Sequence, residues 1–211
     1  MKTQTLGEEI ANSITHGIAT LLSIAGLVIL MVVSASKGSA WAVTSLSIFG
    51  ATLIVLYLVS TLYHSITHDG TKRFLKFLDH SSIYLLIAGS YTPITLVALR
   101  GPWGWSLFGL IWGMALTGVL INAFALNRLK ILSVLSYLMM GWLVVVAIKP
   151  LTQTCPQGLI LWLLIGGISY TLGTVFYSWK KLPYHHTIWH LFVIGGSTAH
   201  FFGMLFYIAP V

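Results

Sequence analysis

Two histidines, His186 and His190, stand four residues apart near the end of a chain that carries few ionisable side chains. Residues at i and i+4 of a helix share one face, about 6 Å apart along its axis, which suits two ligands on one metal ion. His64 is a candidate third ligand, and three imidazoles with an open fourth position are typical of catalytic zinc. Ser60, one helical turn before His64, is a candidate to stabilise an oxyanion, and Asp79 is a candidate general base.

Simpler interpretations of these residues remain open at this point. A histidine at a helix end is often an interfacial residue or a cap, and i,i+4 histidine pairs also arise by chance. His68 lies four residues after His64, so spacing alone does not exclude a rival site that uses it. Asp79 is also a good residue to cap the start of a helix. Residue types and spacing therefore leave zinc binding as one of two interpretations.

The composition predicts that these polar groups belong to a membrane protein. The 211 residues are 57% hydrophobic and 7% charged, and the mean hydropathy is +0.90. Seven apolar stretches approach the roughly 20 residues that a helix needs to cross the hydrocarbon. They cover residues 14–34, 41–63, 80–99, 104–124, 131–148, 159–178 and 187–207. We therefore expect an all-α integral membrane protein, a seven-transmembrane helix bundle that forms a single domain over residues 1–211.

The basic residues are unevenly distributed between the two ends of the predicted helices. If the N-terminus is cytoplasmic, eight of them lie on the cytoplasmic side and three on the other. The cytoplasmic set is Lys2, Lys72, Arg73, Lys76, Arg128, Lys130, Lys180 and Lys181, and the opposite set is Lys37, Arg100 and Lys149. The positive-inside rule therefore predicts a cytoplasmic N-terminus and an outside C-terminus. Because topology explains the net charge of +7, no nucleic-acid partner is expected.

This topology brings the polar residues to one level of the membrane. His64 ends the second predicted span, and Asp79 opens the third after a loop over residues 65–78. His186 and His190 occupy the first turns of the seventh span. All of them lie at the cytoplasmic end, where polar groups at membrane depth are costly and are usually kept for function.

The two motifs resemble those of a known family. Ser60-Thr-Leu-Tyr-His64 and His186-Thr-Ile-Trp-His190, with Asp79 between them, are similar to the motifs of the hemolysin III family. That family belongs with the progestin and adiponectin receptors and is more distantly related to the alkaline ceramidases. The bacterial branch resembles this chain best, which implies the cell membrane of a bacterium as its location.

The resemblance also extends to the first helix and covers nearly the whole chain. Glu9-Ile-Ala-Asn12-Ser-Ile-Thr-His16 is similar to the opening Glu-x-x-Asn-x-x-x-His signature of the family. We expect His16 either to pack beside the metal ligands or to be a capping or interfacial residue. Glu9 and Asn12, three residues apart, either brace the helix ends around the site or form an ordinary solvated first turn.

Roles for the motif residues follow from the resemblance. It implies that His64, His186 and His190 hold Zn²⁺ and that Asp79 contacts the water on the zinc, with Ser60 beside it. His68, His80 and His185 fall outside the family pattern and are therefore not expected to be ligands.

Three functions are compatible with such a site. The first is a zinc-dependent hydrolase of a lipid amide or ester, with membrane lipids as partners and substrates, that serves membrane-lipid homeostasis. The second is a zinc-stabilised receptor or sensor without turnover. The third is a hemolysin-type protein that permeabilises membranes, although every span is apolar rather than amphipathic. The sequence carries no signal for an oligomeric state.

Overall fold

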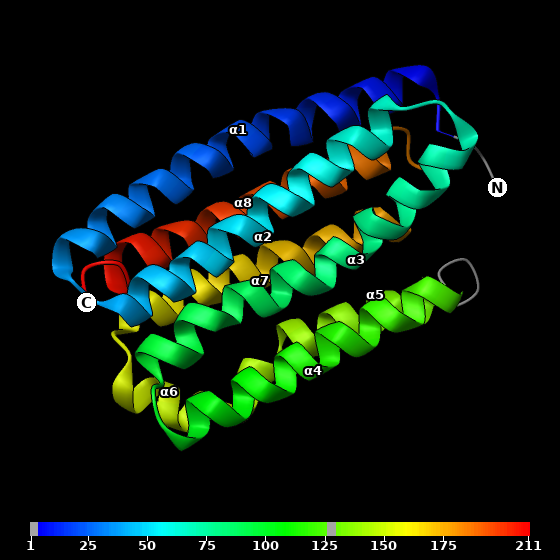
Figure 1. Cartoon of the computed structure of the whole chain (residues 1–211). Helices are drawn as coiled ribbons and strands as arrows, with labels where there is room; N and C mark the ends of the chain where they lie inside the picture. Colours follow the sequence, from blue (N-terminus) through cyan, green and yellow to red (C-terminus); the bar gives the residue numbers. More distant parts are fainter. Residues whose placement is uncertain (1–3, 126–129) are drawn as a thin grey trace.

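The computed structural model describes residues 4–125 and 130–211, which form a helical bundle (Figure 1). Within these residues, seven helical segments are long and apolar enough to cross a membrane, which confirms the predicted fold class. The elements are α1 (Leu6–Lys37), α2 (Ala40–Ser65), α3 (Asp69–Pro93), η1 (Ile94–Ala98), α4 (Pro102–Ala125), α5 (Lys130–Gly141), η2 (Leu143–Ala147), α6 (Ile148–Thr154), α7 (Gln157–Ser178) and α8 (His185–Tyr207). Lys2 and Arg128 of the charge argument lie outside the described residues.

α1 begins and ends with well-formed caps. Thr5 accepts a hydrogen bond from the Glu8 amide, and the Glu8 carboxylate accepts one from the Thr5 amide, which completes a capping box. Gly38 ends the helix in the left-handed conformation, with φ of 76°. The cap explains why α1 starts well before residue 14, the predicted edge of the first span. The extra turns are the polar ones that carry Glu9 and Asn12.

The buried and exposed faces of α1 suit a helix at the lipid boundary. Asn12, His16 and Ser23 are buried, whereas Ile14 and Leu21 are exposed. Large apolar side chains therefore cover the outside of the helix, while polar and small ones face the bundle. Lipid favours this arrangement, because helices in membranes associate through small and hydrogen-bonding residues.

α3 starts earlier than predicted, which corrects the position of Asp79. The helix begins at Asp69, and His68 caps it by accepting a hydrogen bond from the Thr71 amide. The predicted loop over residues 65–78 is therefore wrong, and Asp79 lies inside α3 rather than at an N-cap. The charged residues of α3 indicate where the chain leaves the hydrocarbon. They do not indicate where the helix begins, because helical backbone remains stable among the headgroups.

α3 also departs from regular α-helix at its far end. Pro93 ends its α-helical part, and the chain continues through the π-helical turn η1. Proline has no amide hydrogen and clashes with the preceding turn, which explains why the helix type changes here.

The fifth span, predicted as one helix over residues 131–148, is interrupted. α5 ends at Gly141, and the span continues through the 3₁₀ segment η2 into α6. Tyr91 of α3 lies at the break, where its hydroxyl donates to the Gly141 carbonyl (2.9 Å) and accepts from the Val144 amide (2.8 Å). These bonds satisfy backbone groups that would otherwise be unpaired in a medium without water.

The helix ends that carry the predicted site lie at one end of the bundle. The start of α1, the end of α2, the start of α3 and the start of α8 gather there, and α8 ends at the opposite side (Figure 1). α1 packs against both α2 and α8, and α2 packs against α3. Seven spans place the two ends of the chain on opposite sides of the bundle, as observed. The orientation of the bundle relative to the cytoplasm stays a prediction.

Candidate metal centre

The three predicted ligands come together at this end of the bundle. His64 of α2 and His186 and His190 of α8 each offer a ring nitrogen, and these nitrogens lie within 4.8 Å of one another. Their ring centroids are 5.2 Å (His64 to His186), 5.3 Å (His64 to His190) and 4.6 Å (His186 to His190) apart. We call these three side chains the histidine cluster. They are close enough to hold one metal ion.

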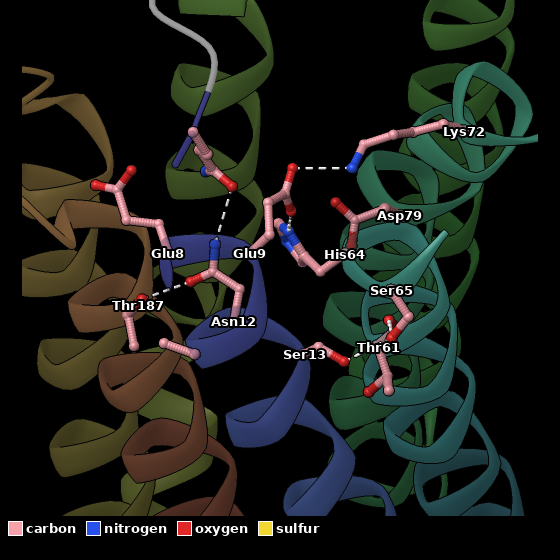
Figure 2. Close-up of polar contacts among 12 residues, drawn as sticks. Glu8, Glu9, Asn12, Ser13, Thr61, His64, Ser65, Lys72, Asp79 and Thr187 are labelled. Atoms are coloured by element: carbon pink, nitrogen blue, oxygen red, sulfur yellow. Dashed lines mark hydrogen bonds and ion pairs between the residues drawn. The ribbon is translucent and has the colours of Figure 1, made fainter. Parts of the chain in front are cut away.

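His64 is oriented by Glu9 of α1. Its Nδ1 lies 2.6 Å from a Glu9 carboxylate oxygen, and the other carboxylate oxygen accepts a hydrogen bond from the Lys72 ammonium at 2.8 Å (Figure 2). Because a carboxylate only accepts, the His64 proton sits on Nδ1 and the Nε2 lone pair is free. That Nε2 is buried and has no hydrogen-bond partner among the described residues. A buried lone pair without a partner is costly, and a metal ion would satisfy it.

His190 shows the same orientation with a different anchor. Its Nδ1 lies 3.2 Å from the Thr15 hydroxyl, which itself is 2.9 Å from the carbonyl oxygens of Ala11 and Asn12. The single hydroxyl proton is donated to those carbonyls, so the oxygen accepts from His190 Nδ1–H. Nε2 is then the nitrogen available to a metal, as on His64. Metal-binding histidines commonly use their second nitrogen in this way, which fixes tautomer and ring orientation.

The first turns of α1 also position the start of α8. Glu8 accepts a hydrogen bond from the Tyr184 amide at 2.9 Å, just before α8 begins. Thr187 donates to the Asn12 side-chain carbonyl at 2.6 Å, and the Asn12 amide donates to Gln4 at 3.0 Å (Figure 2). Asn12 is fully buried. The hydrogen bonds from the Tyr184 amide to Glu8 and from Thr187 to Asn12 join α1 to the start of α8. They help to position α8 so that both of its motif histidines face α2.

His16 packs against the cluster and does not cap α1. Its ring stacks on His190 with centroids 3.5 Å apart and planes 10° apart, and it meets Tyr57 edge-on at 4.9 Å. The side chain is buried, and both ring nitrogens are without hydrogen-bond partners in the described part of the chain. Of the two expectations for His16, contact with the predicted ligands is therefore the one observed.

The two predicted catalytic residues border the cluster without belonging to it. Ser60 is buried on the same face of α2 as His64, one turn deeper. Asp79 points from α3 towards the side of His64 in Figure 2, and a carboxylate oxygen lies 3.5 Å from His80 Nδ1. The donors that lie within 4.8 Å of one another are the three histidines, without Asp79. His68, the rival ligand, caps α3 at the exposed surface.

A cavity of about 290 Å³ adjoins the site on its deeper side. Leu56 of α2, Ile83 of α3 and Val193 of α8 line it, together with apolar residues of the fifth span and α7. The cavity comes nearest to the cluster at Trp189 and Val193 of α8, one and three residues from His190. On α2 it is deeper, because Leu56 lies eight residues, about 12 Å along the helix axis, from His64. His200 lines the cavity as well, and its Nε2 is 3.4 Å from the Leu163 carbonyl oxygen.

Some contacts at the site could not be predicted from residue types. Thr15 belongs to no distinctive motif, unlike its neighbour His16. In the sequence Lys72 is only a basic residue near the end of a span, whereas in the structure it forms an ion pair with Glu9. No signal in the sequence pointed to this contact, because residues 65–78 were expected to form a loop.

The helices and the cluster define a multi-pass membrane protein with a candidate intramembrane metal centre. The model of the family described as "Haemolysin-III related" matches residues 4–201, and the chain belongs to that family. The resemblance expected from the motifs is thereby confirmed. Together with the bacterial relatives described below, the seven apolar helices identify a multi-pass protein of the bacterial plasma membrane.

Similar proteins come from bacteria and from animals. The chain is 51% identical to the Hemolysin-3 homolog of Bacillus subtilis (strain 168) over 207 residues, 98% of this chain and 97% of the relative. It is 49% identical to Hemolysin-3 of Bacillus cereus over 208 residues, 99% of this chain and 95% of the relative. The Monocyte to macrophage differentiation factor of Homo sapiens is 30% identical over 209 residues, 95% of this chain and 84% of that protein. No solved structure matches the chain significantly.

Proposed function

We propose that this protein is a zinc-dependent hydrolase that acts on a lipid amide or ester within the membrane. The observation that carries the proposal is the histidine cluster, because anchors on the Nδ1 atoms of His64 and His190 leave both Nε2 atoms for a metal. Three imidazoles with an open position suit zinc better than magnesium or calcium, which prefer oxygen ligands. A zinc ion held by these residues would lower the pKa of a coordinated water to about 7, so that a nucleophile would be available at neutral pH.

The residues around the cluster would share the remaining steps. The Asp79 carboxylate would accept a proton as the nucleophile attacks the scissile carbonyl, and return it to the leaving group. The Ser60 hydroxyl would donate a hydrogen bond to the oxygen on which negative charge develops. Both side chains lie beside His64 on helices that the Glu9 contacts hold together. The site is also screened from bulk water by the packed helices, which strengthens such interactions.

The adjoining cavity supports a lipid as the substrate. Its lining is largely apolar, and it extends from Trp189, next to His190, to Leu56, two turns deeper on α2 than His64. Its volume of about 290 Å³ is near the lower end of the roughly 300–1,000 Å³ typical of ligand pockets. An amphiphile would place its apolar chain there and its carbonyl at the level of the histidines. A water-soluble amide would gain nothing from this lining.

A receptor or sensor without turnover is the second candidate. The cluster takes ligands from α2 and α8, and its anchors Glu9 and Lys72 belong to α1 and α3. A metal there would tie together four helices whose relative shift can carry a signal. The name Hemolysin-3 of the Bacillus cereus relative suggests membrane permeabilisation as a third candidate.

Metal analysis of the purified protein is the first half of the test. We expect about one zinc per chain in the wild type and little zinc in a His190→Ala variant, since two imidazoles hold zinc weakly. His68→Asn is the matched control, because it also removes an imidazole but keeps a residue suited to cap α3. Equal zinc content in wild type and His190→Ala would refute the metal site.

Product release is the second half of the test. Wild type, His68→Asn, His190→Ala and Asp79→Asn are each incubated with a panel of lipid amides and esters, and released fatty acid is measured by mass spectrometry. The hydrolase requires product from the first two proteins and none from the other two. Zinc without any product would favour the sensor. Dye leakage from vesicles that is equal in all four proteins would favour permeabilisation.

A further inference from the structure

A second, strongly basic pocket lies on the surface close to the histidine cluster. It has a volume of about 320 Å³ and is lined by Tyr63 at the end of α2 and by four residues from the first turns of α3. Those four are Asp69, Lys72, Arg73 and Lys76. Three cations and one carboxylate give the lining a formal charge of +2 (3 − 1). We call this hollow the α2–α3 basic pocket.

Helix geometry turns the three cations towards a common point. Lys72 and Lys76 are four residues apart and Arg73 and Lys76 are three apart, which are the spacings of neighbours on one side of a helix. The Lys72 ammonium lies 5.2 Å above the Tyr63 ring, so the two walls of the pocket face each other. Lys72 donates one of its three protons to Glu9 and keeps two for a ligand.

The surroundings of the pocket are those of the lipid boundary. Phe74 follows Arg73 and is 60% exposed, and Leu62 precedes Tyr63 and is 39% exposed. A large exposed apolar side chain thus stands beside the pocket on each of the two helices. A free acidic peptide or a nucleic acid would have to rest on this apolar border, whereas a phospholipid would lay its chains along it. The pocket also lies at helix ends, at the level where headgroups are found.

We propose that the α2–α3 basic pocket binds the phosphate of an anionic membrane phospholipid. Arg73 would engage two phosphate oxygens with its planar guanidinium, and the ammonium groups of Lys72 and Lys76 would neutralise the remaining charge. The acyl chains would run past Phe74 and Leu62. This inference is independent of the proposed hydrolase, since it concerns a separate pocket and needs no turnover.

The pocket also borders the candidate metal centre. Lys72 belongs to the pocket and pairs with Glu9, which in turn holds His64. Variants of Lys72 would therefore disturb both sites. The test uses Arg73 and Lys76, which leave the Glu9 contacts in place.

Native mass spectrometry in detergent measures lipid binding directly. Purified protein is titrated with phosphatidylglycerol, which is anionic, and with phosphatidylcholine, which is zwitterionic. We expect the wild type to prefer phosphatidylglycerol and the Arg73→Gln/Lys76→Gln variant to bind it roughly 30-fold more weakly. The matched control is Lys180→Gln/Lys181→Gln, which removes the same charge from the turn between α7 and α8. It should bind phosphatidylglycerol as the wild type does.

Several outcomes would overturn the proposal. Equal losses in the two double variants would mean that general positive charge, and not this pocket, attracts the lipid. Displacement of phosphatidylglycerol by millimolar inorganic phosphate would mean that the pocket binds free phosphate and not a lipid.

Two controls separate lost charge from lost structure. The charge-preserving Arg73→Lys/Lys76→Arg variant should retain most binding. Circular dichroism and unchanged zinc content in Arg73→Gln/Lys76→Gln show that a loss of binding does not come from misfolding.

Discussion

The Glu9–His64 contact gives the sharpest quantitative prediction for this protein. Glu9 Oε2 lies 2.6 Å from His64 Nδ1, and the Glu9 side chain is 21% exposed, so water screens the contact only in part. Replacing a hydrogen-bond partner of a metal-binding histidine typically lowers metal affinity by about 10- to 100-fold. That range corresponds to roughly 1.4–2.7 kcal/mol of binding free energy.

Two substitutions of Glu9 are expected to fall at the two ends of this range of zinc affinity. Glu9→Gln keeps an oxygen that can accept from Nδ1–H but removes the negative charge, so zinc affinity should fall by about tenfold. Glu9→Ala removes the acceptor as well and should approach a hundredfold loss. A carboxylate away from the cluster gives a matched control. Asp69→Asn removes one negative charge from the exposed first turn of α3 and leaves Glu9 and the histidine cluster in place.

Competition with a chromophoric chelator in detergent measures these affinities at fixed pH. From tightest to weakest binding, the expected order of zinc dissociation constants is wild type and Asp69→Asn, then Glu9→Gln, then Glu9→Ala. If both Glu9 variants bound zinc as tightly as the wild type, the carboxylate would not support a metal ligand. The orientation argued for His64 would then be wrong.

Two further predictions concern the frame around the site. Tyr91→Phe removes only the hydroxyl that bonds Gly141 and Val144, so it should destabilise the break in the fifth span by about 1–3 kcal/mol, seen as a lower midpoint of thermal unfolding in detergent. An unchanged midpoint would show that the break needs no support from α3. Cys155 should react slowly with a thiol reagent, because the side chain is buried and burial raises the pKa of its thiol. Since the thiolate is the reactive form, the rate should grow as pH rises towards that pKa, and fast alkylation at neutral pH would contradict the burial.

The fold was predictable where the hydrocarbon dictates it. Seven apolar runs gave seven spans, because a helix in lipid must be both long and apolar. The start of α3 was not predictable in this way, since Lys72 and Lys76 lower the hydropathy without breaking the helix. The break at Gly141 was also hidden, because its sequence stays apolar. It depends on Tyr91, a residue about fifty positions away, whose hydroxyl replaces the lost helical bonds.

The candidate site was predictable in its residue types but not in its contacts. The four-residue spacing of His186 and His190 fixes a common face on any helix, so that part required no structure. That Glu9 bonds His64 and that Thr15 bonds His190 depends on how α1 lies against two other helices. The packing of α1 against α2 and α8 cannot be predicted from any short stretch of the sequence. The same holds for the cavity, whose lining comes from α2, α3, the fifth span, α7 and α8.

In the proposed function, His64, His186 and His190 together hold a zinc ion with one position open. Zinc K-edge X-ray absorption spectroscopy of the purified protein is the sharpest test of this site, because the spectrum reports the ligands of the metal itself. We expect three imidazole nitrogens and one further oxygen or nitrogen ligand at about 2.0–2.1 Å. A spectrum without imidazole scattering, or one that His190→Ala leaves unchanged, would contradict it.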